Sequence, residues 1–358
     1  MATTLEDRAC GALLGAFIGD ALALGPHWYY DLDRLHADYG AWVTDYTAPK
    51  PGRYHAGLKA GQSSQSGFLL ELTLRSLAEC GSYDAMDFCR RLDADFFPLI
   101  DGTPNNGPGG YTSQSMREAY RLRVGKGLPW GRVGGYTDNT EGAERALALA
   151  VRYARDPQRL AQTVSGNVAL TQIDPTVGAM TTAYCAALGL VVAGERFDAG
   201  ISAKLMAEVR DGRLPFHTIT GPGETGVADG EETPFHAGHF ASPDALLGMG
   251  SIAAAAVDPA IRVEPATKAA LLYGLPCAVY HQFPSVYYLA ARFADNFEAA
   301  VLTAVNSGGQ NQARAILVGA LVGGMVGFSR IPQRFVDGLE KSAERIALAR
   351  KMAAQLAV

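Results

Sequence analysis

The fold is best predicted from the stretch Asn306-Ser307-Gly308-Gly309-Gln310-Asn311-Gln312-Ala313-Arg314. It lies between two apolar segments with helical spacing, residues 295–305 and 315–328. A Gly-Gly break at the start of a buried helix exposes backbone N–H groups and side chains to a central cleft. An amide-capped turn between helices would explain one of these amides, but not three polar side chains beside an apolar helix. The stretch therefore predicts packed helices with a polar cleft between them.

Helical spacing recurs along the rest of the chain. The first helical segment repeats glycine every fourth residue on one face, at Gly11, Gly15 and Gly19. Each glycine costs a helix about 1 kcal/mol against alanine, so close packing of a neighbouring helix is the expected compensation. The predicted helices, besides the two named above, are residues 5–24, 67–79, 83–97, 113–124, 137–153, 174–192, 245–257 and 264–273.

No alternating strand series and no domain linker interrupt this pattern. We therefore predict an all-α fold, a compact single-domain helical bundle spanning residues 1–358. Two segments lack helical spacing, residues 28–60 and an acidic loop at about 211–244. The acidic loop also contains the pair His236 and His239, which could bind a metal, although the loop has no cysteine and no regular element to hold the site.

Composition excludes several classes of partner. The net charge is −5, and residues 211–244 account for all of it with six acidic residues and one base. Without a basic block, nucleic acid and acidic membranes are not expected partners. The longest apolar run, residues 315–328, is shorter than the ~20 residues that cross a bilayer. No signal peptide is evident either, so we expect a soluble cytoplasmic protein with no membrane partner.

The two ends of the chain together resemble the ADP-ribosylglycohydrolases. Residues 306–314 and the small-residue helix after them are similar to that family's C-terminal signature, a glycine pair followed by Asp-x-Asp-Thr. Residues 11–22 are similar to its opening helix, and the last glycine-rich segment ends before Ile331-Pro332, as in the family. The resemblance implies an all-α glycohydrolase that acts on ADP-ribose attached to a side chain or hydroxyl. It also implies two magnesium ions that hold the ribose diol.

The sequence departs from this family at the metal ligands. Gln310 and Gln312 stand where the resemblance places magnesium-binding aspartates. Residues 61–67 offer Gln and Ser where the family carries Thr-Asp-Asp-Thr, and no carboxylate lies between Asp45 and Glu71. Mg²⁺ dehydrates reluctantly and needs hard, anionic oxygen ligands, which neutral amides do not supply. We therefore expect no metal ligands and no cofactor, and no magnesium binding in the cleft.

A polar and aromatic cluster after the first helix holds the first catalytic candidates. Asp20 ends that helix and could act as an acid or base, or could only tie helix ends together. His27 lies where the family often has an acidic residue, and it could act as a general acid or base near neutral pH. Trp28 and Tyr30 could stack on a base or a sugar ring, or could form a hydrophobic plug.

Further candidates lie before later helices. His55 and Gln65 belong to a polar region that could hydrogen-bond a ligand, or in which the Ser/Gln run could only cap a helix. Asp138 is the third catalytic candidate; it is spaced from Glu141 as in a capping box, which would explain it without catalysis. Asn106 lies in a Gly/Asn/Pro loop that could approach a ligand or be a plain turn.

These candidates define a cleft for a small nucleoside, ribosyl or ADP-ribosyl ligand. Amides both donate and accept hydrogen bonds, which suits a vicinal diol. Three functions stay open: a metal-independent glycoside hydrolase using Asp20, His27 or Asp138 as acid and base, an inactive binding protein, or a structural protein like the family's crystallin-like members. The expected substrate-binding residues are Trp28, Tyr30, His55, Gln65, Asn106, Gly308, Gly309, Gln310, Asn311 and Gln312.

Overall fold

The computed structural model describes residues 3–216 and 244–356. Within these ranges the chain forms α-helices joined by turns and by longer irregular segments such as residues 40–64, and its only extended pairing is three isolated β-bridges. The prediction of an all-α fold is confirmed. The helices are α1 (Leu5–Ala23), α2 (Leu32–Tyr39), α3 (Gln65–Cys80), α4 (Ala85–Arg91), α5 (Gln114–Tyr120), α6 (Glu141–Arg152), α7 (Pro157–Ala169), α8 (Pro175–Ala193), α9 (Ile201–Arg210), α10 (Asp244–Val257), α11 (Ala269–Tyr273), α12 (Val279–Arg292), α13 (Phe297–Asn306), α14 (Asn311–Val326), α15 (Gln333–Gly338) and α16 (Ser342–Ala354).

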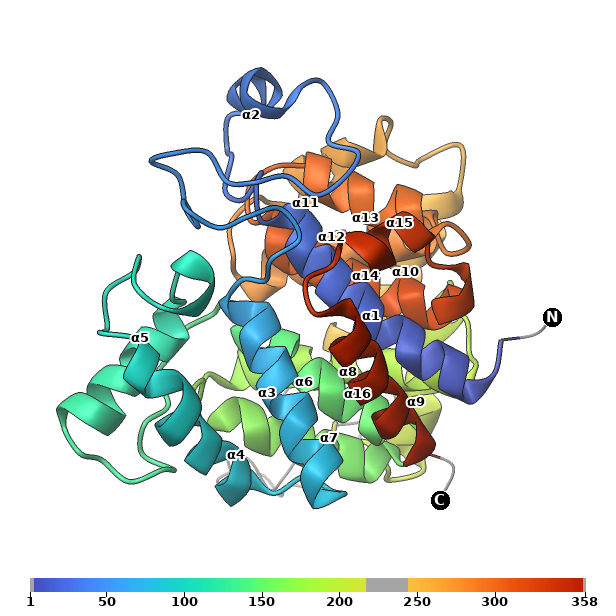
Figure 1. Cartoon of the computed structure of the whole chain (residues 1–358). Helices are drawn as coiled ribbons and strands as arrows, with labels where there is room; N and C mark the ends of the chain where they lie inside the picture. Colours follow the sequence, from blue (N-terminus) through green and yellow to red (C-terminus); the bar gives the residue numbers. More distant parts are fainter. Residues whose placement is uncertain (1–2, 217–243, 357–358) are drawn as a thin grey trace, which may run out of the picture.

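Helix α1 lies at the centre and packs along α14, although the two are far apart in sequence (Figure 1). The contact is made backbone to backbone. A Cβ atom added at Gly15 would lie 2.1 Å from the carbonyl oxygen of Gly319, and one added at Gly11 would lie 2.2 Å from that of Gly323. No side chain fits between the helices at these points, so the glycine spacing of α1 is required by α14. The predicted close approach is confirmed.

Two groups of buried apolar residues meet on α3. Leu70 and Leu74 of this helix face the main core around α1, α6, α8 and α14. Leu69 and Leu72 face a smaller cluster that includes Phe88 and other side chains of α4 and α5. Because one helix contributes to both clusters, the region of α4 and α5 is joined to the bundle through packed side chains (Figure 1).

Helix α6 begins later than its sequence pattern predicts. The expected start at residue 137 is wrong, because the segment before Glu141 is held by α12 instead. The Asp138 carboxylate accepts a hydrogen bond from the Tyr280 hydroxyl at 2.5 Å, and the Asp138 carbonyl accepts one from the Val279 N–H at 2.8 Å. The capping box between Asp138 and Glu141 therefore does not form. Helix α14 differs in the other direction, since it begins at Asn311 rather than at residue 315.

Several helices were not predicted from the sequence. Helix α2 lies inside the segment expected to be irregular, residues 28–60. Helix α7 opens on Asp156-Pro157, and the Asp156 side chain caps it. Helix α12 contains Pro284, which hides its helical pattern. Most of the predicted acidic loop, with His236 and His239, lies outside the described residues.

Helix α8 is long and apolar enough to cross a membrane by length and composition, with a mean hydropathy of 1.6. Its Thr and Tyr residues interrupt the apolar run in the sequence, which hides this property. In the structure 72% of this stretch is buried, and α8 packs against α6, α7 and α14. It is a core helix of the bundle.

Candidate functional site

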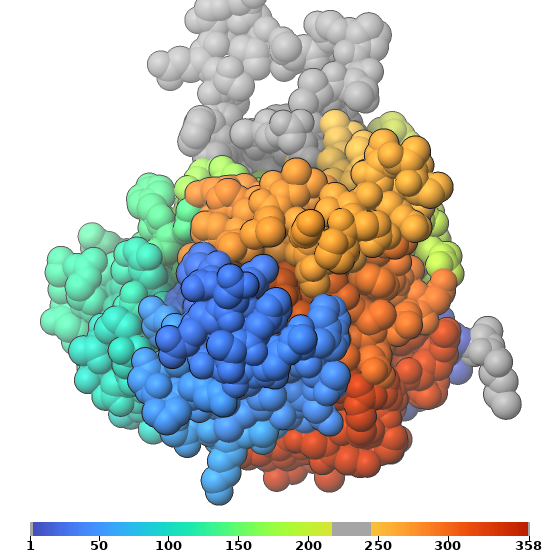
Figure 2. Space-filling view, turned by 90° about the horizontal axis from the view of Figure 1, so that it is seen from above, coloured from blue at the N-terminus to red at the C-terminus, as the bar shows by residue number. Residues whose placement is uncertain are grey.

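A cavity of about 90 Å³ lies where the start of α3, the start of α6 and the start of α14 converge. Loops from three parts of the chain close around it. In Figure 2, which views the molecule from above, the blue segment after α1 lies between the teal segment near residue 110 and the orange segment near residue 280. The predicted site residues that line this cavity are His27, Trp28, His55, Gln65, Asp138, Gln310 and Gln312.

The other predicted site residues lie behind the cavity wall or away from it. Tyr30 is 55% exposed and Asn106 is an exposed loop residue whose carbonyl accepts the Thr112 hydroxyl. Asn311 is buried, and its side-chain amide donates to the carbonyls of Pro26 and Val305 at 3.0 and 2.8 Å. These contacts give Asn311 a role in holding the loop before α14.

The Gly308–Gly309 turn connects the start of α14 to the segment that follows α1. Both glycines have positive φ, 68° and 61°, which other residues rarely adopt. The Gly309 N–H donates to the Tyr29 carbonyl at 2.7 Å, and the Trp28 N–H donates to the Gly309 carbonyl at 3.1 Å. This two-way bridge places the segment after α1 directly beside the start of α14. The glycines therefore shape the site through the backbone.

Asp20 holds the start of α3 in place through hydrogen bonds. Its carboxylate accepts hydrogen bonds from the Ser64 N–H at 3.0 Å and the Ser64 hydroxyl at 2.5 Å, and Ser64 is the residue that caps α3. Burial raises the pKa of Asp20, while the hydrogen bonds from Ser64 act in the opposite direction. Asp20 does not line the cavity, and its contacts fit the structural alternative that the sequence left open.

Two buried histidines form the wall next to Gln310. His27 Nδ1 lies 2.5 Å from His55 Nε2, His27 Nε2 contacts the Gln310 amide, and His55 Nδ1 contacts the Gly109 carbonyl. Burial and the neighbouring His55 hold the pKa of His27 well below its usual value, and burial lowers the pKa of His55 to about 4. Both rings are therefore neutral near pH 7, so His27 lacks the charge that an acid would need.

Aromatic rings cover this histidine pair. The Trp28 ring stacks on His27 with centroids 4.6 Å apart, and it meets Tyr54 and Tyr111 edge to face at 4.5 and 4.7 Å. Trp28 and His55 both have positive φ, 59° and 63°, which is unusual for residues with large side chains. Such backbone conformations persist only where the surroundings enforce them, and they concentrate at functional sites.

Glu144, like Glu141, is a buried carboxyl that lines the cavity, and the sequence analysis missed it. It accepts hydrogen bonds from the Thr140 hydroxyl at 2.6 Å and from the Ser66 hydroxyl. Burial raises its pKa to about 7, despite these two donors. A signal was present, because Glu141, Glu144 and Arg145 are charged residues at the start of a helical segment that is otherwise small and apolar up to Val151.

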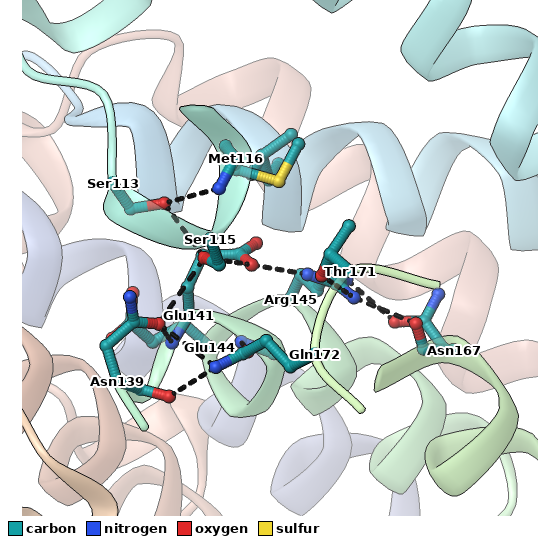
Figure 3. Close-up of polar contacts among 12 residues, drawn as sticks. Ser113, Ser115, Met116, Asn139, Glu141, Glu144, Arg145, Asn167, Thr171 and Gln172 are labelled. Carbon is teal, nitrogen blue, oxygen red and sulfur yellow. Dashed lines mark hydrogen bonds and ion pairs between the residues drawn. The ribbon is translucent and has the colours of Figure 1, made fainter. Parts of the chain in front are cut away.

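Glu141, one helical turn before Glu144, is held by a buried ion pair. The Arg145 guanidinium donates to Glu141 at 2.5 Å and also reaches Asn167 and Thr171 at 2.8 and 2.9 Å (Figure 3). The network ties α6 to α7 directly behind the cavity (Figure 3). The two glutamates thus differ in environment, since one is paired with a cation and the other receives only neutral donors.

The residues of this site do not fit a pair of magnesium ions. No group of three or more His, Cys, Asp or Glu side chains that could hold a metal occurs in the described parts of the chain. Gln310 and Gln312 are neutral, and the carboxylates that line the cavity are engaged by Tyr280, by Arg145 or by hydroxyl groups. Mg²⁺ needs charged oxygen ligands in octahedral geometry, which this set does not supply.

Comparisons with known proteins agree with the fold. A family model described as ADP-ribosylglycohydrolase matches residues 1–357. A solved structure titled "ADP-ribosylglycohydrolase-related protein complex" is similar in fold, with a TM-score of 0.63 and 18% sequence identity. The match covers 98% of this chain and 99% of that one. No curated protein matches in sequence.

Proposed function

The chain belongs to the ADP-ribosylglycohydrolase family, and from this premise we propose that it hydrolyses a ribosyl or ADP-ribosyl glycosidic bond without a metal ion. The family acts on ADP-ribosyl bonds, whereas the residues of this cavity are unsuited to its magnesium pair. The observation that carries the proposal is Glu144, a buried carboxyl facing the cavity with its pKa raised to about 7.

Glu144 supplies the general acid in this proposal. A carboxyl with a pKa near the working pH is partly protonated there and can give its proton to a leaving group. The Thr140 and Ser66 hydroxyls hold the side chain in place. Protonation of the leaving atom by Glu144 accompanies cleavage of its bond to the anomeric carbon, so the departing group leaves as a neutral molecule.

Asp138 supplies the base. It lines the cavity, is partly exposed, and accepts a hydrogen bond from Tyr280 at 2.5 Å. A water molecule attacks the anomeric carbon and gives one proton to the Asp138 carboxylate, while Glu144 loses its proton to the leaving group. The sum is one water consumed and one glycosidic bond cleaved, and proton exchange with solvent restores both residues. Glycosidases use such a pair of carboxyls with opposite roles.

The test compares Glu144→Gln with the wild type. Glutamine keeps the shape of the side chain but has no proton of suitable acidity, so turnover of ADP-ribosyl compounds should fall by about 10²–10⁴-fold. The assay uses an ADP-ribosylated peptide and O-acetyl-ADP-ribose, each with a chelator present throughout. Glu344→Gln, on the exposed face of α16, is the matched control and should keep full activity. Activity that appears only when magnesium is added would overturn the metal-independent mechanism.

A binding or structural protein is the second candidate function. The observation in its favour is the closure of the cavity, because Trp28, Tyr54 and Tyr111 contact one another and leave only about 90 Å³ free. Ligand-induced stabilisation in thermal unfolding, without turnover, would support a binding protein. A protein that neither turns over nor binds these compounds would support the structural role.

A further inference from the structure

The buried histidine pair fixes the direction of a chain of hydrogen bonds that ends at Gln310. Its first member is the Gly109 carbonyl, which can only accept, so His55 Nδ1 carries a proton and donates to it. In a neutral ring the other nitrogen is then an acceptor. His55 Nε2 therefore accepts a hydrogen bond from His27 Nδ1, which lies 2.5 Å away.

The same rule extends to the Gln310 amide. With its proton on Nδ1, a neutral His27 offers only a lone pair at Nε2, so the amide atom that meets it must be a donor. The structure places Gln310 Oε1 at this position, and the hydrogen-bond pattern therefore requires the amide to be flipped. Oxygen and nitrogen of a glutamine amide are distinguished by their hydrogen-bond partners. The NH₂ group of Gln310 accordingly faces His27, and its carbonyl oxygen is the end left for the cavity that Gln310 lines.

Burial, His55 and Arg53 lower the pKa of His27, and the hydrogen bond with Gln310 acts in the opposite direction. The side chains that meet its two nitrogens, His55 and Gln310, are both neutral. Arg53 lies close enough to His27 to disfavour a second positive charge, and it donates a hydrogen bond to the Trp28 carbonyl at 2.9 Å. With both histidines neutral, every donor in the series from Gln310 through His27 and His55 to the Gly109 carbonyl meets an acceptor.

Gln312 is oriented in the same sense by a separate contact. Its side-chain NH₂ donates to the backbone carbonyl of Asp20 at 3.5 Å, a group that can only accept. Its carbonyl oxygen has no hydrogen-bond partner among the described residues, and Gln312 lines the cavity. Each glutamine is therefore held through its side-chain NH₂ group, Gln310 by His27 and Gln312 by the Asp20 carbonyl.

We propose that Gln310 and Gln312 present only carbonyl oxygens to the cavity, so that the site selects a ligand with two neighbouring hydroxyl groups that both donate. This corrects the sequence expectation that the amides would both donate and accept. For the identity of the ligand the inference rests on the proposed function, while the orientation of the amides stands on the hydrogen bonds alone. The histidines act as positioning residues, because they reach the ligand only through Gln310.

Nitrogen NMR of the imidazole rings tests the orientation without any ligand. In ¹⁵N-histidine-labelled wild type at pH 7, His27 and His55 should both be neutral with the proton on Nδ1; His27→Gln and His55→Gln assign their signals among the seven histidines. Gln310→Glu offers a carboxylate that can only accept, so His27 Nε2 should gain a proton in that variant. A wild-type His27 that is charged, or protonated on Nε2, would overturn the proposal.

Titration with sugar derivatives tests the selection. Calorimetry compares ADP-ribose with analogues methylated at one hydroxyl of the terminal ribose, and with the corresponding deoxy analogues. Loss of one hydroxyl donor should weaken binding by about 2- to 10-fold. The deoxy and the methylated analogue should lose a similar amount of affinity, because both changes remove the donor. Equal affinity for all of them would overturn the selection by donors. If no probe binds while the tautomers are as expected, the proposed function fails and the amide orientation stands.

Discussion

At the scale of single residues, Glu144 has a charge that depends on folding. Its usual pKa of 4.5 rises to about 7 because the folded chain removes the carboxyl from water. The folded state therefore holds a proton more tightly than the unfolded state between these two values. Its contribution to stability is fully present below pH 4.5 and is lost as the pH rises through 7.

We expect Glu144→Gln to flatten the dependence of stability on pH. The shift corresponds to about 3 kcal/mol of unfolding free energy lost by the wild type between pH 4.5 and pH 8, relative to the variant. Urea denaturation of both proteins at several pH values measures this difference. Parallel curves for the two proteins would mean that this carboxyl titrates as it does in water.

In the hydrogen-bond network behind Glu144, replacement of Arg145 should reduce the stability of the fold most. Arg145→Met removes all of its hydrogen bonds to Glu141, Asn167 and Thr171 and leaves a buried carboxylate unpaired. Breaking a buried pair in this way costs about 3–5 kcal/mol. Adding Glu141→Gln removes the stranded charge, so the double variant should recover part of the stability. Denaturant midpoints of the two variants settle the point, and a double variant no more stable than the single one would contradict it.

At the scale of helices, the contact between α1 and α14 depends on missing side chains. The Cβ of Gly15→Ala would lie 2.1 Å from the Gly319 carbonyl oxygen, so the two helices must separate. We expect a net loss of about 1–3 kcal/mol, although alanine favours the helix itself.

Gly166 provides the matched control for that substitution. It lies within α7, where an added Cβ would meet no atom within 4 Å. Gly166→Ala should therefore stabilise the protein by up to about 1 kcal/mol. Urea unfolding of both variants measures the contrast, and a stabilised Gly15→Ala protein would show that the helices do not need this close approach.

The helices show which features a sequence reveals. Glycine at every fourth residue of α1 and the Asp174-Pro175 start of α8 are local signals, and both are confirmed. The site depended on contacts between distant segments. Nothing near Glu144 in the sequence says that α3 will bury it, and nothing near His27 says that His55 will share its proton. The capping box was open as an alternative explanation of Asp138, because the local sequence does not show that this side chain bonds to Tyr280 of another helix.

At the scale of the whole molecule, the two apolar clusters share α3 and should unfold together. Trp130 lies against the smaller cluster, stacked on Phe97 with centroids 5.9 Å apart, so its fluorescence reports that region. In a Trp28→Phe and Trp42→Phe variant, the fluorescence transition should coincide with loss of helical circular dichroism, as two-state unfolding requires. Two separate midpoints would instead identify the region of α4 and α5 as an independent unit.

The contact between His27 and Gln310 joins residues that are 283 positions apart. Ribosomes extend a chain by about 5–20 residues per second, so the second residue is made about 15–60 s after the first. Throughout that interval α1 has emerged without α14, and its apolar surface has no native partner. The newborn chain must therefore be kept from aggregating until its last quarter is synthesised, and a pause in translation anywhere between α1 and α14 would prolong that exposure by its own length.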